Sequence, residues 1–388
     1  MMNLHYDLIV YISKYLLDRG KLNLTQTCKK LDQLKHVFTY DCSVSLDRIQ
    51  RLTYFDQFTH VRSGNFTEEK YPKCAECVEF IVRKNYNPSI FTFSPRVTHL
   101  FFDIGFRKPV TIPSTVTHVK FEPLFKASIY FSEPSSLVSL ICSKSYNESI
   151  NHFPKSLTNL DLGSKFDVPI DGVVFPNLKS IKFGCAFNRD ISANMFPQLT
   201  HMELSDLFVQ SIEGVVPTTV THLTFGSRFD QSVSGHIPES VTHLTFGSNF
   251  NRSIYNSIPA NVTHLTFGTR FNKPISDLIH RHVTNLTFGK HFNQCIADSI
   301  PLSVTHLTFG EHFNQPIAGH IPASVEKLIF GYEFNQSIRE IPLTVKFLQL
   351  GAGFKQPIQS FPNIEQIMIK VADRDVLFIN GVLFDVYG

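Results

Sequence analysis

The sequence predicts a small all-α N-terminal module followed by a β-rich, right-handed solenoid of about 14 repeat units. Three observations support this fold class. Residues 220 to 331 repeat with a period of 21, the chain contains 37 Phe but no Trp, and its 388 residues exceed what one ordinary core supports. An excess of one aromatic residue type is expected when one position of a unit is copied many times.

The repeat is clearest where the segment Val220-Thr-His-Leu-Thr-Phe-Gly226 returns. Close copies occupy residues 241–247, 262–268, 283–289 and 304–310. The glycine that ends each copy recurs every 21 residues up to Gly331, and degenerate copies spaced by 19 to 21 residues extend the series in both directions. We therefore assign residues 76–370 to the solenoid.

Each unit is expected to form one short strand and to return without a helix. The V-T-H-L-T-F stretch is rich in β-branched residues, and the glycine after it ends the strand. An Ile-Pro pair later in the unit, such as Ile237-Pro238, favours an extended return. Stacked units would then form one long parallel sheet with about 4.8 Å between neighbouring strands.

Phenylalanine recurs at the sixth and tenth positions of the unit, which together hold more than half of all Phe in the chain. We expect these rings to form two interior stacks, because each buried ring covers about 150–250 Å². An Asn usually follows the tenth-position Phe and is expected to bond backbone groups between coils. These asparagines are Asn188, Asn251, Asn272, Asn293, Asn314 and Asn335, and Asp230 can substitute for one of them.

This unit resembles the FNIP repeat, a short relative of the leucine-rich repeat. The namesake Phe-Asn pair stands at residues 250–251, 271–272, 292–293, 313–314 and 334–335, and Ile-Pro stands at 237–238, 258–259, 300–301, 321–322 and 341–342. The resemblance implies a curved, leucine-rich-repeat-like solenoid that binds other proteins. The family is best known from amoebae and from large viruses that infect them.

Residues 1–42 do not repeat and are expected to form a helical module. Leu8, Ile9, Ile12, Tyr15 and Leu16 fall on one helical face. We expect the segment 18–20 to break this helix and a second helical stretch to begin at residue 22. Because about forty residues bury little core, some of this apolar surface should face a partner or the first repeats.

The helical module resembles an F-box, although His5 and Gly20 stand where that family usually has a proline and an acidic residue. The resemblance implies docking onto the Skp adaptor of a cullin-type ubiquitin ligase. The residues that match the family's pattern, and would make this contact, are Leu4, Leu8, Ile9, Ile12, Leu16, Leu22, Leu24, Cys28 and Leu31. The alternative is a pair of helices that only caps the solenoid.

Two flanking segments complete the expected organisation. Residues 43–75 are interpreted as a connector and N-terminal cap with a degenerate repeat, which runs from Phe58 to Gly64. Residues 371–388 are interpreted as a β-hairpin cap, because Asn380-Gly381 lies between two apolar runs. Such a hairpin would close the last open edge of the sheet.

Exposed positions that differ between units are candidate sites for a target protein. The pair after each glycine qualifies, and its second residues are Arg228, Asn249, Arg270, His291, His312 and Glu333. A second variable stripe follows the Ile, for example at 234–236, 255–257 and 276–278. The alternative is that these exposed positions are simply unconstrained.

Histidine recurs at the third position of the strand, at His99, His118, His201, His222, His243, His264 and His306. A flat row does not surround an ion tetrahedrally, so we expect a polar ladder that resists full protonation rather than a metal site. Cys74 and Cys77 form a lone C-x-x-C without the second pair of a zinc site. We expect Cys77 to be a buried residue that opens a strand.

Several function classes are disfavoured by the sequence. It contains no nucleotide-binding, serine-hydrolase or zinc-protease motif, so we expect no enzyme, cofactor or metal. A net charge of +3 without a basic run argues against nucleic acid. No apolar run reaches the length of about 18 residues that a membrane span needs, and no signal peptide precedes the repeats. We expect a cytoplasmic protein, in the host cytoplasm if viral, that acts as a monomer within a complex.

The leading hypothesis is therefore a non-catalytic substrate-recognition subunit of a cullin-type (SCF) ubiquitin ligase, which docks the Skp adaptor and binds an unknown target protein. The alternative is a ligase-independent scaffold or decoy whose N-terminal helices only cap the solenoid. A third hypothesis is a glycan binder that uses the long strand face.

Overall fold

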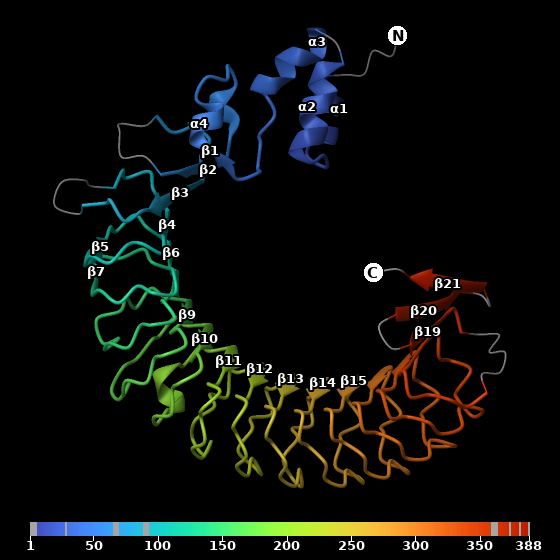
Figure 1. Cartoon of the computed structure of the whole chain (residues 1–388). Helices are drawn as coiled ribbons and strands as arrows, with labels where there is room; N and C mark the ends of the chain where they lie inside the picture. The colour runs from blue at the N-terminus through green and yellow to red at the C-terminus, as the bar shows by residue number, and fades with distance from the viewer. Residues whose placement is uncertain are drawn as a thin grey trace. The chain divides into compact units, whose positions relative to one another are not determined.

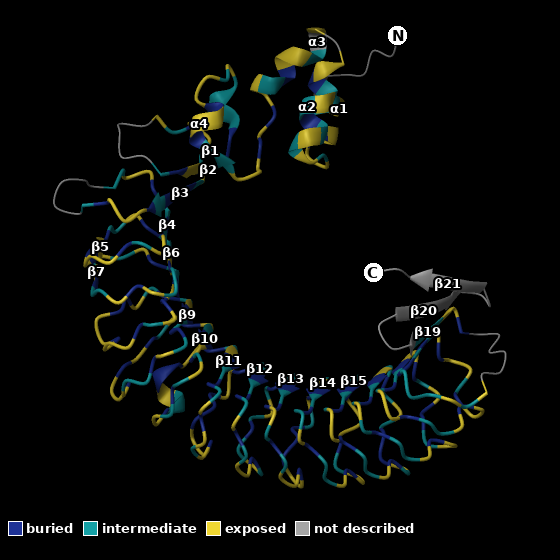
Figure 2. Cartoon of the chain, viewed as in Figure 1, coloured by how far each residue is buried: buried dark blue, intermediate teal, exposed yellow. Residues whose placement is uncertain are grey.

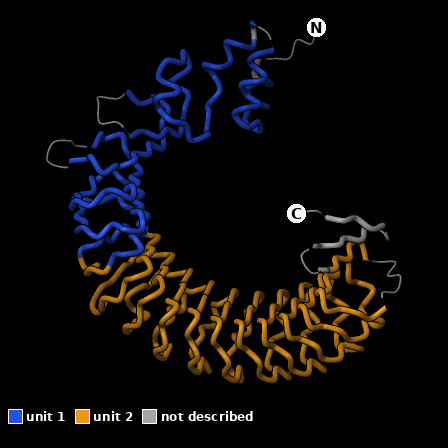
Figure 3. The backbone as a smooth tube through the Cα atoms, viewed as in Figure 1, with its two compact units in different colours: residues 1–146, 152–157 blue, residues 147–151, 158–388 orange. Residues whose placement is uncertain are grey.

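Short parallel strands, one in each repeat unit, make up most of the computed structural model of this chain (Figure 1). The structure describes residues 6–27, 29–64, 70–87, 93–357, 364–371, 374–379 and 382–386. The backbone divides into two units, residues 1–146 with 152–157 and residues 147–151 with 158–388 (Figure 3). The predicted fold class, a β-rich solenoid with a small helical part at its N-terminus, is confirmed.

The first unit contains the helical module and the more degenerate repeats. Its helices are α1 (Tyr6–Ser13), α2 (Asp18–Gln26), α3 (Lys29–Asp32) and α4 (Leu46–Ile49), with 3-10 turns at Gln33–His36 and Phe55–Gln57. Its main parallel strands are β1 (Val44–Ser45), β2 (His60–Ser63), β3 (Cys77–Val82), β4 (His99–Phe102), β6 (His118–Phe121) and β8 (Ser139–Ile141). A second parallel pair joins β5 (Val110–Ile112) to β7 (Ile129–Phe131).

The second unit contains the regular repeats and a 3-10 turn at Ala193–Met195. Its parallel strands are β9 (Asn159–Asp161), β10 (Ser180–Lys182), β11 (His201–Glu203), β12 (His222–Thr224), β13 (His243–Thr245), β14 (His264–Thr266), β15 (Asn285–Thr287), β16 (His306–Thr308), β17 (Lys327–Ile329), β18 (Phe347–Leu350) and β19 (Gln366–Val371). Equivalent residues pair across neighbouring strands, for example Leu223 with Leu244 and Leu244 with Leu265. Within this unit the strands follow the inner edge of a curved coil (Figure 1).

Two stacks of phenylalanine fill the interior of the second unit, as predicted. Phe250 and Phe271 of the tenth position have ring centroids 6.2 Å apart, and Phe246 and Phe267 of the sixth position are 5.6 Å apart. All four rings are buried, and buried residues recur in every turn of the coil (Figure 2). Dense packing of this kind is where most of the stability of a repeat array arises.

The asparagine ladder is also confirmed. The backbone N–H of Asn272 donates to Asn251 Oδ1 at 3.0 Å, and the same bond joins Asn293 to Asn272 and Asn314 to Asn293. Asp230 accepts the equivalent bond from Asn251 at 2.9 Å. Each side chain thus satisfies a buried backbone donor of the next unit, which would otherwise be costly.

The helical module differs from its prediction in one respect. The segment 18–20 was expected to separate two helices, but α2 begins at Asp18 and the helices are separated by residues 14–17 instead. Asp18 suits the first turn of a helix because a carboxylate is favourable near the helix N-terminus. A Cβ atom at Gly20 would lie 3.4 Å from Leu16 Cβ, which is an ordinary van der Waals contact.

The chain ends in antiparallel strands. β20 (Arg374–Ile379) pairs with β19, and β21 (Val382–Val386) pairs with β20. The predicted turn residues Asn380 and Gly381 lie outside the described residues. Within the described part of the chain, no helix is both long and apolar enough to cross a membrane.

Candidate binding surfaces

The strand face of the second unit presents a ladder of stacked imidazoles. His201, His222, His243 and His264 follow one another across β11 to β14, and their ring centroids lie 4.1 to 4.2 Å apart. In the first unit His99 and His118 stack in the same way, at 4.3 Å. A repeated side chain in a parallel register therefore produces the polar ladder that the sequence predicts.

A threonine before each histidine fixes the imidazole. The Oγ1 atom of Thr242 lies 3.0 Å from Nδ1 of His243 and also donates to the carbonyl oxygen of Thr221 at 3.2 Å. The same pair of contacts recurs in the neighbouring units, and in β15 Asn285 replaces the imidazole and accepts a bond from Thr284. Nδ1 is thus satisfied in each rung, which leaves Nε2 as the outward-facing polar atom.

Four of the stacked histidines resist protonation for a physical reason. Burial lowers the pKa of His222 and His243, and the proximity of the other imidazoles lowers it further. Burial likewise lowers the pKa of His99 and His118. Near neutral pH these histidines are therefore uncharged hydrogen-bonding groups.

A shallow groove of about 440 Å³ runs beside the ladder, at the ends of β11 to β15. Its walls include Thr224, Thr245, Thr266 and Thr287 and the backbone of the glycine column. The glycines are required there, because a Cβ atom at Gly247 would lie 1.8 Å from the carbonyl oxygen of Gly226. The groove results from the close stacking of the units. Its threonine hydroxyls can form hydrogen bonds with a ligand on the strand face.

The six target-binding candidates form one column beyond the glycines. The backbone N–H of each donates to a carbonyl oxygen in the preceding unit, as Arg228 does to Asp206 at 2.8 Å and Arg270 to Ser248 at 2.8 Å. The structure exposes Arg228, Arg270, His291 and Glu333 and leaves Asn249 and His312 half-buried. The structure therefore brings the predicted residues together on one edge of the coil, and their role in binding stays a prediction.

Side-chain contacts connect neighbouring units at one end of this column and beside it. Lys290 Nζ lies 2.7 Å from Glu311 Oε2, and His312 Nδ1 lies 2.7 Å from Glu333 Oε1. The hydrogen bond from Lys290 lowers the pKa of Glu311. These pairs cross between units and were not predicted, because each unit contributes only one partner and the repeat pattern is lost at these variable positions.

Helix α1 leaves an apolar face in contact with solvent. Leu8, Tyr11, Ile12 and Tyr15 stand at helical spacing and are exposed by 48%, 55%, 41% and 75%. The hydroxyls of Tyr11 and Tyr15 are 3.0 Å apart, and the two rings meet edge to face with their centroids 5.5 Å apart. Tyr11 was not among the predicted residues, although its position three residues after Leu8 is the signal that places it on this face.

The other predicted adaptor-binding residues are less accessible. Ile9, Leu16, Leu22, Leu24 and Leu31 are half-buried. Leu4 and Cys28 lie outside the described residues. Within the helical module, Lys21 connects α2 to the segment near Thr39, because it is buried and donates to Asp18 Oδ1 at 3.2 Å and to the carbonyl oxygen of Thr39 at 2.7 Å.

The C-x-x-C segment differs from its prediction. Cys77 does open β3, but it is half-buried and its Sγ lies 3.4 Å from His99 Nδ1, whereas Cys74 is exposed. The first position of this strand faces outward, so a small residue there is not enclosed. Across the described residues, no group of three or more His, Cys, Asp or Glu side chains is arranged to hold a metal ion.

Comparisons with known proteins agree with this description. The family model described as FNIP Repeat matches residues 146–186, 208–249, 229–269, 250–280, 271–312 and 313–353. No curated protein matches the chain significantly. The crystal structure of CroV588, described as a novel circular LRR protein structure, matches with a TM-score of 0.64 and 28% sequence identity over 81% of this chain.

This chain spans 56% of the length of CroV588, so the likeness covers only part of that protein. The matched segments lie in regular repeats whose strands, phenylalanine stacks and asparagine ladder are described above. Repeat solenoids of this kind serve as protein–protein interaction scaffolds rather than enzymes. Residues 146–186 and 208–353 are thus similar to FNIP repeats, and the chain folds into a leucine-rich-repeat-like solenoid.

Proposed function

We propose that this chain is the substrate-recognition subunit of a cullin-type ubiquitin ligase, in which the helical module docks the Skp adaptor and the solenoid binds a target protein. The observation that supports docking is the exposed face of Leu8, Tyr11, Ile12 and Tyr15. Contiguous exposed apolar side chains on a helix mark an interaction site more often than they mark free surface. An amphipathic helix laid on a partner's groove is a common mode of recognition.

The solenoid supplies the target-binding half of the proposal. Its interior positions are nearly identical from unit to unit, whereas the column that contains Arg228, Arg270 and Glu333 changes in both charge and size. A surface of this kind discriminates between partners through positions that differ, while the repeated positions maintain the coil. Ubiquitin transfer then requires only that the target be held near the ligase, so this chain contributes proximity and no chemistry.

The same proposal places the chain in the cytoplasm, as a monomer within the ligase complex and without a cofactor. The alternative is a ligase-independent scaffold or decoy. In that case the apolar face of α1 would contact something other than the adaptor.

Co-precipitation of the Skp adaptor and cullin with full-length protein separates the two functions. The informative variant is Leu8→Lys/Ile12→Lys, which places two charges on the exposed face of α1, beside a Gln33→Lys control in the following 3-10 turn. Capture by the wild type and the control, lost in the double variant while its solenoid still unfolds cooperatively, supports the ligase role. Absence of capture by the wild type contradicts it and favours the scaffold.

A further inference from the structure

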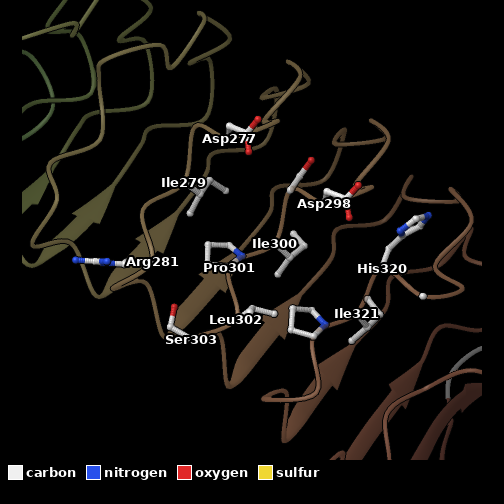
Figure 4. A pocket seen from close by; sticks show the side chains of 13 residues that line it. Asp277, Ile279, Arg281, Asp298, Ile300, Pro301, Leu302, Ser303, His320 and Ile321 are labelled. Atoms are coloured by element: carbon white, nitrogen blue, oxygen red, sulfur yellow. The ribbon is translucent and has the colours of Figure 1, made fainter.

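An open groove crosses three successive return segments of the second unit (Figure 4). Asp277, Ile279, Arg281 and the segments 298–303 and 319–322 line it, and its volume is about 760 Å³. Ile279, Ile300 and Ile321 lie along its base and are each less than one-tenth exposed, whereas Leu302 is 82% exposed. The groove therefore has an apolar base and an apolar side chain that projects into solvent.

The repeat pattern changes at this groove. The return segments 237–240, 300–303 and 321–324 read Ile-Pro-x-Ser, 258–261 reads Ile-Pro-Ala-Asn, and 279–282 reads Ile-His-Arg-His. Ser303 Oγ donates to the carbonyl oxygen of Val283 at 2.6 Å, whereas in the altered segment His282 Nδ1 contacts the carbonyl oxygen of Ala260 at 2.7 Å. The coil therefore continues through a different hydrogen bond, while position 281 presents an arginine.

The small residues on either side keep this arginine and the leucine accessible. The column that contains Arg281 and Leu302 has Ala260 before them and Ala323 after them. Both Arg281 and Leu302 are exposed. In this column the long side chains of Arg281 and Leu302 are thus flanked by two short alanine side chains.

Two carboxylates complete the groove. Asp277 and Asp298 occupy equivalent turns with φ of 56° and 52°, where glycine stands at 235 and 319, and both are exposed. Figure 4 shows Arg281 and Asp298 on opposite sides of Ile300 and Pro301. Among the described residues, neither aspartate nor Arg281 forms an ion pair within 4.0 Å. Charges of opposite sign thus flank an apolar strip, and each is available to a partner.

We infer that this groove binds an extended segment of the target protein, with a basic side chain at Asp277 and Asp298, an apolar side chain on Ile300 and Leu302, and an acidic side chain at Arg281. Figure 4 shows Ile279 between Asp277 and Arg281. The basic and acidic residues of the ligand should therefore stand on either side of an apolar residue. This inference rests on the proposed function, in that the solenoid binds a protein.

Charge complementarity determines which segments are accepted. A ligand with acidic residues at both ends would be repelled by Asp277 and Asp298. A ligand with basic residues at both ends would be repelled by Arg281. Exposed ion pairs contribute little affinity singly, so the apolar base supplies the contact area and the charges supply selection and orientation.

The test is panning of a phage-displayed library of random 12-residue peptides on the full-length chain. The wild type is expected to enrich peptides in which a basic and an acidic residue stand on either side of an apolar residue. Arg281→Glu turns the groove wholly acidic, so it should enrich peptides with two basic residues. It should bind a wild-type-selected peptide about tenfold more weakly, and Arg281→Ala about fivefold more weakly. Arg339→Glu, an exposed arginine outside the lining segments, is the matched control and should change neither result.

Two outcomes overturn the inference. One is a wild-type selection without the paired charges, and the other is equal binding of the selected peptides by wild type and Arg281→Glu. These outcomes are independent of adaptor capture, because Leu8→Lys/Ile12→Lys leaves the groove unchanged. A chain that captures the adaptor but selects no such peptide would contradict the groove alone. A chain that selects the peptide without capturing the adaptor would contradict the ligase role alone.

Discussion

The regular repeats and helix α1 place their apolar side chains in opposite ways. In residues 220–331 the Val, Leu and Phe at the first, fourth and sixth positions of every unit are buried, and the N–H of each sixth-position Phe donates to the next unit. In α1 and the turn that follows it, Leu8, Tyr11, Ile12 and Tyr15 are exposed. The positions that are identical between units therefore specify the coil. The positions where apolar or charged side chains depart from this pattern and stay exposed are the ones that a partner can recognise.

This contrast predicts that repeated interior positions tolerate almost no change. Gly268→Ala should have the largest effect, because its Cβ would lie 1.8 Å from the carbonyl oxygen of Gly247 and only backbone movement could relieve the clash. We expect a loss of about 4 kcal/mol or more in the free energy of unfolding, measured by urea titration.

The control is Gly214→Ala, where φ is 67° and no atom lies within 4 Å of the added Cβ. That change should cost only the backbone strain of a left-handed residue, about 1–2 kcal/mol. Equal losses at Gly214 and Gly268 would show that conformational freedom, and not close stacking, explains the glycine column.

The asparagine ladder should be next in sensitivity. Asn293→Ala removes the acceptor of the Asn314 N–H and of Gln315 Nε2, at 2.9 and 3.0 Å, and should destabilise the chain by about 1–3 kcal/mol. Asn293→Asp keeps an acceptor oxygen, as Asp230 does naturally, and should cost clearly less. If the two variants were equally destabilised, the ladder's contribution would not come from this acceptor.

The features that the sequence predicted correctly share one cause. The strands, the phenylalanine stacks, the histidine ladder and the bonds along Asn251, Asn272 and Asn293 all follow from a position copied in register, so one unit reveals the environment of the others. Because the position is repeated in every unit, both the neighbour of each side chain and the direction in which it points are fixed. A single sequence normally lacks this information.

The features that the sequence did not predict lack such copies. The start of α2 at Asp18 depends on a short helix packing on the next segment, and the exposure of Tyr11 depends on which side of α1 the chain covers. The groove at Arg281 arises from substitutions in adjacent units that become neighbours only after the coil forms. The role of a variable position depends on which residues lie next to it in the folded coil, and the repeat pattern does not give that information.

The exposed strand face should show the smallest effect, and it should depend on pH. Burial lowers the pKa of His222 and His243 in the folded chain, and neighbouring imidazoles lower it further. The unfolded chain has histidine pKa values of about 6.5 and binds more protons as the pH falls. The ladder's contribution to stability is therefore complete above about pH 6.5 and declines as the pH falls toward the folded pKa.

Urea midpoints measured at pH 7.5 and pH 5 test this expectation, with His222→Asn/His243→Asn as the comparison. Asparagine is the natural residue at position 285 of the same column, where it accepts a bond from Thr284 at 2.9 Å, so the strand should form as before. The wild-type midpoint should fall at pH 5, and the fall should be smaller in the double variant. An unchanged wild-type midpoint, or an equal fall in both proteins, would show that these imidazoles are as easily protonated in the coil as in the unfolded chain. The strand face would then belong with the freely variable surface and not with the repeated positions that maintain the fold.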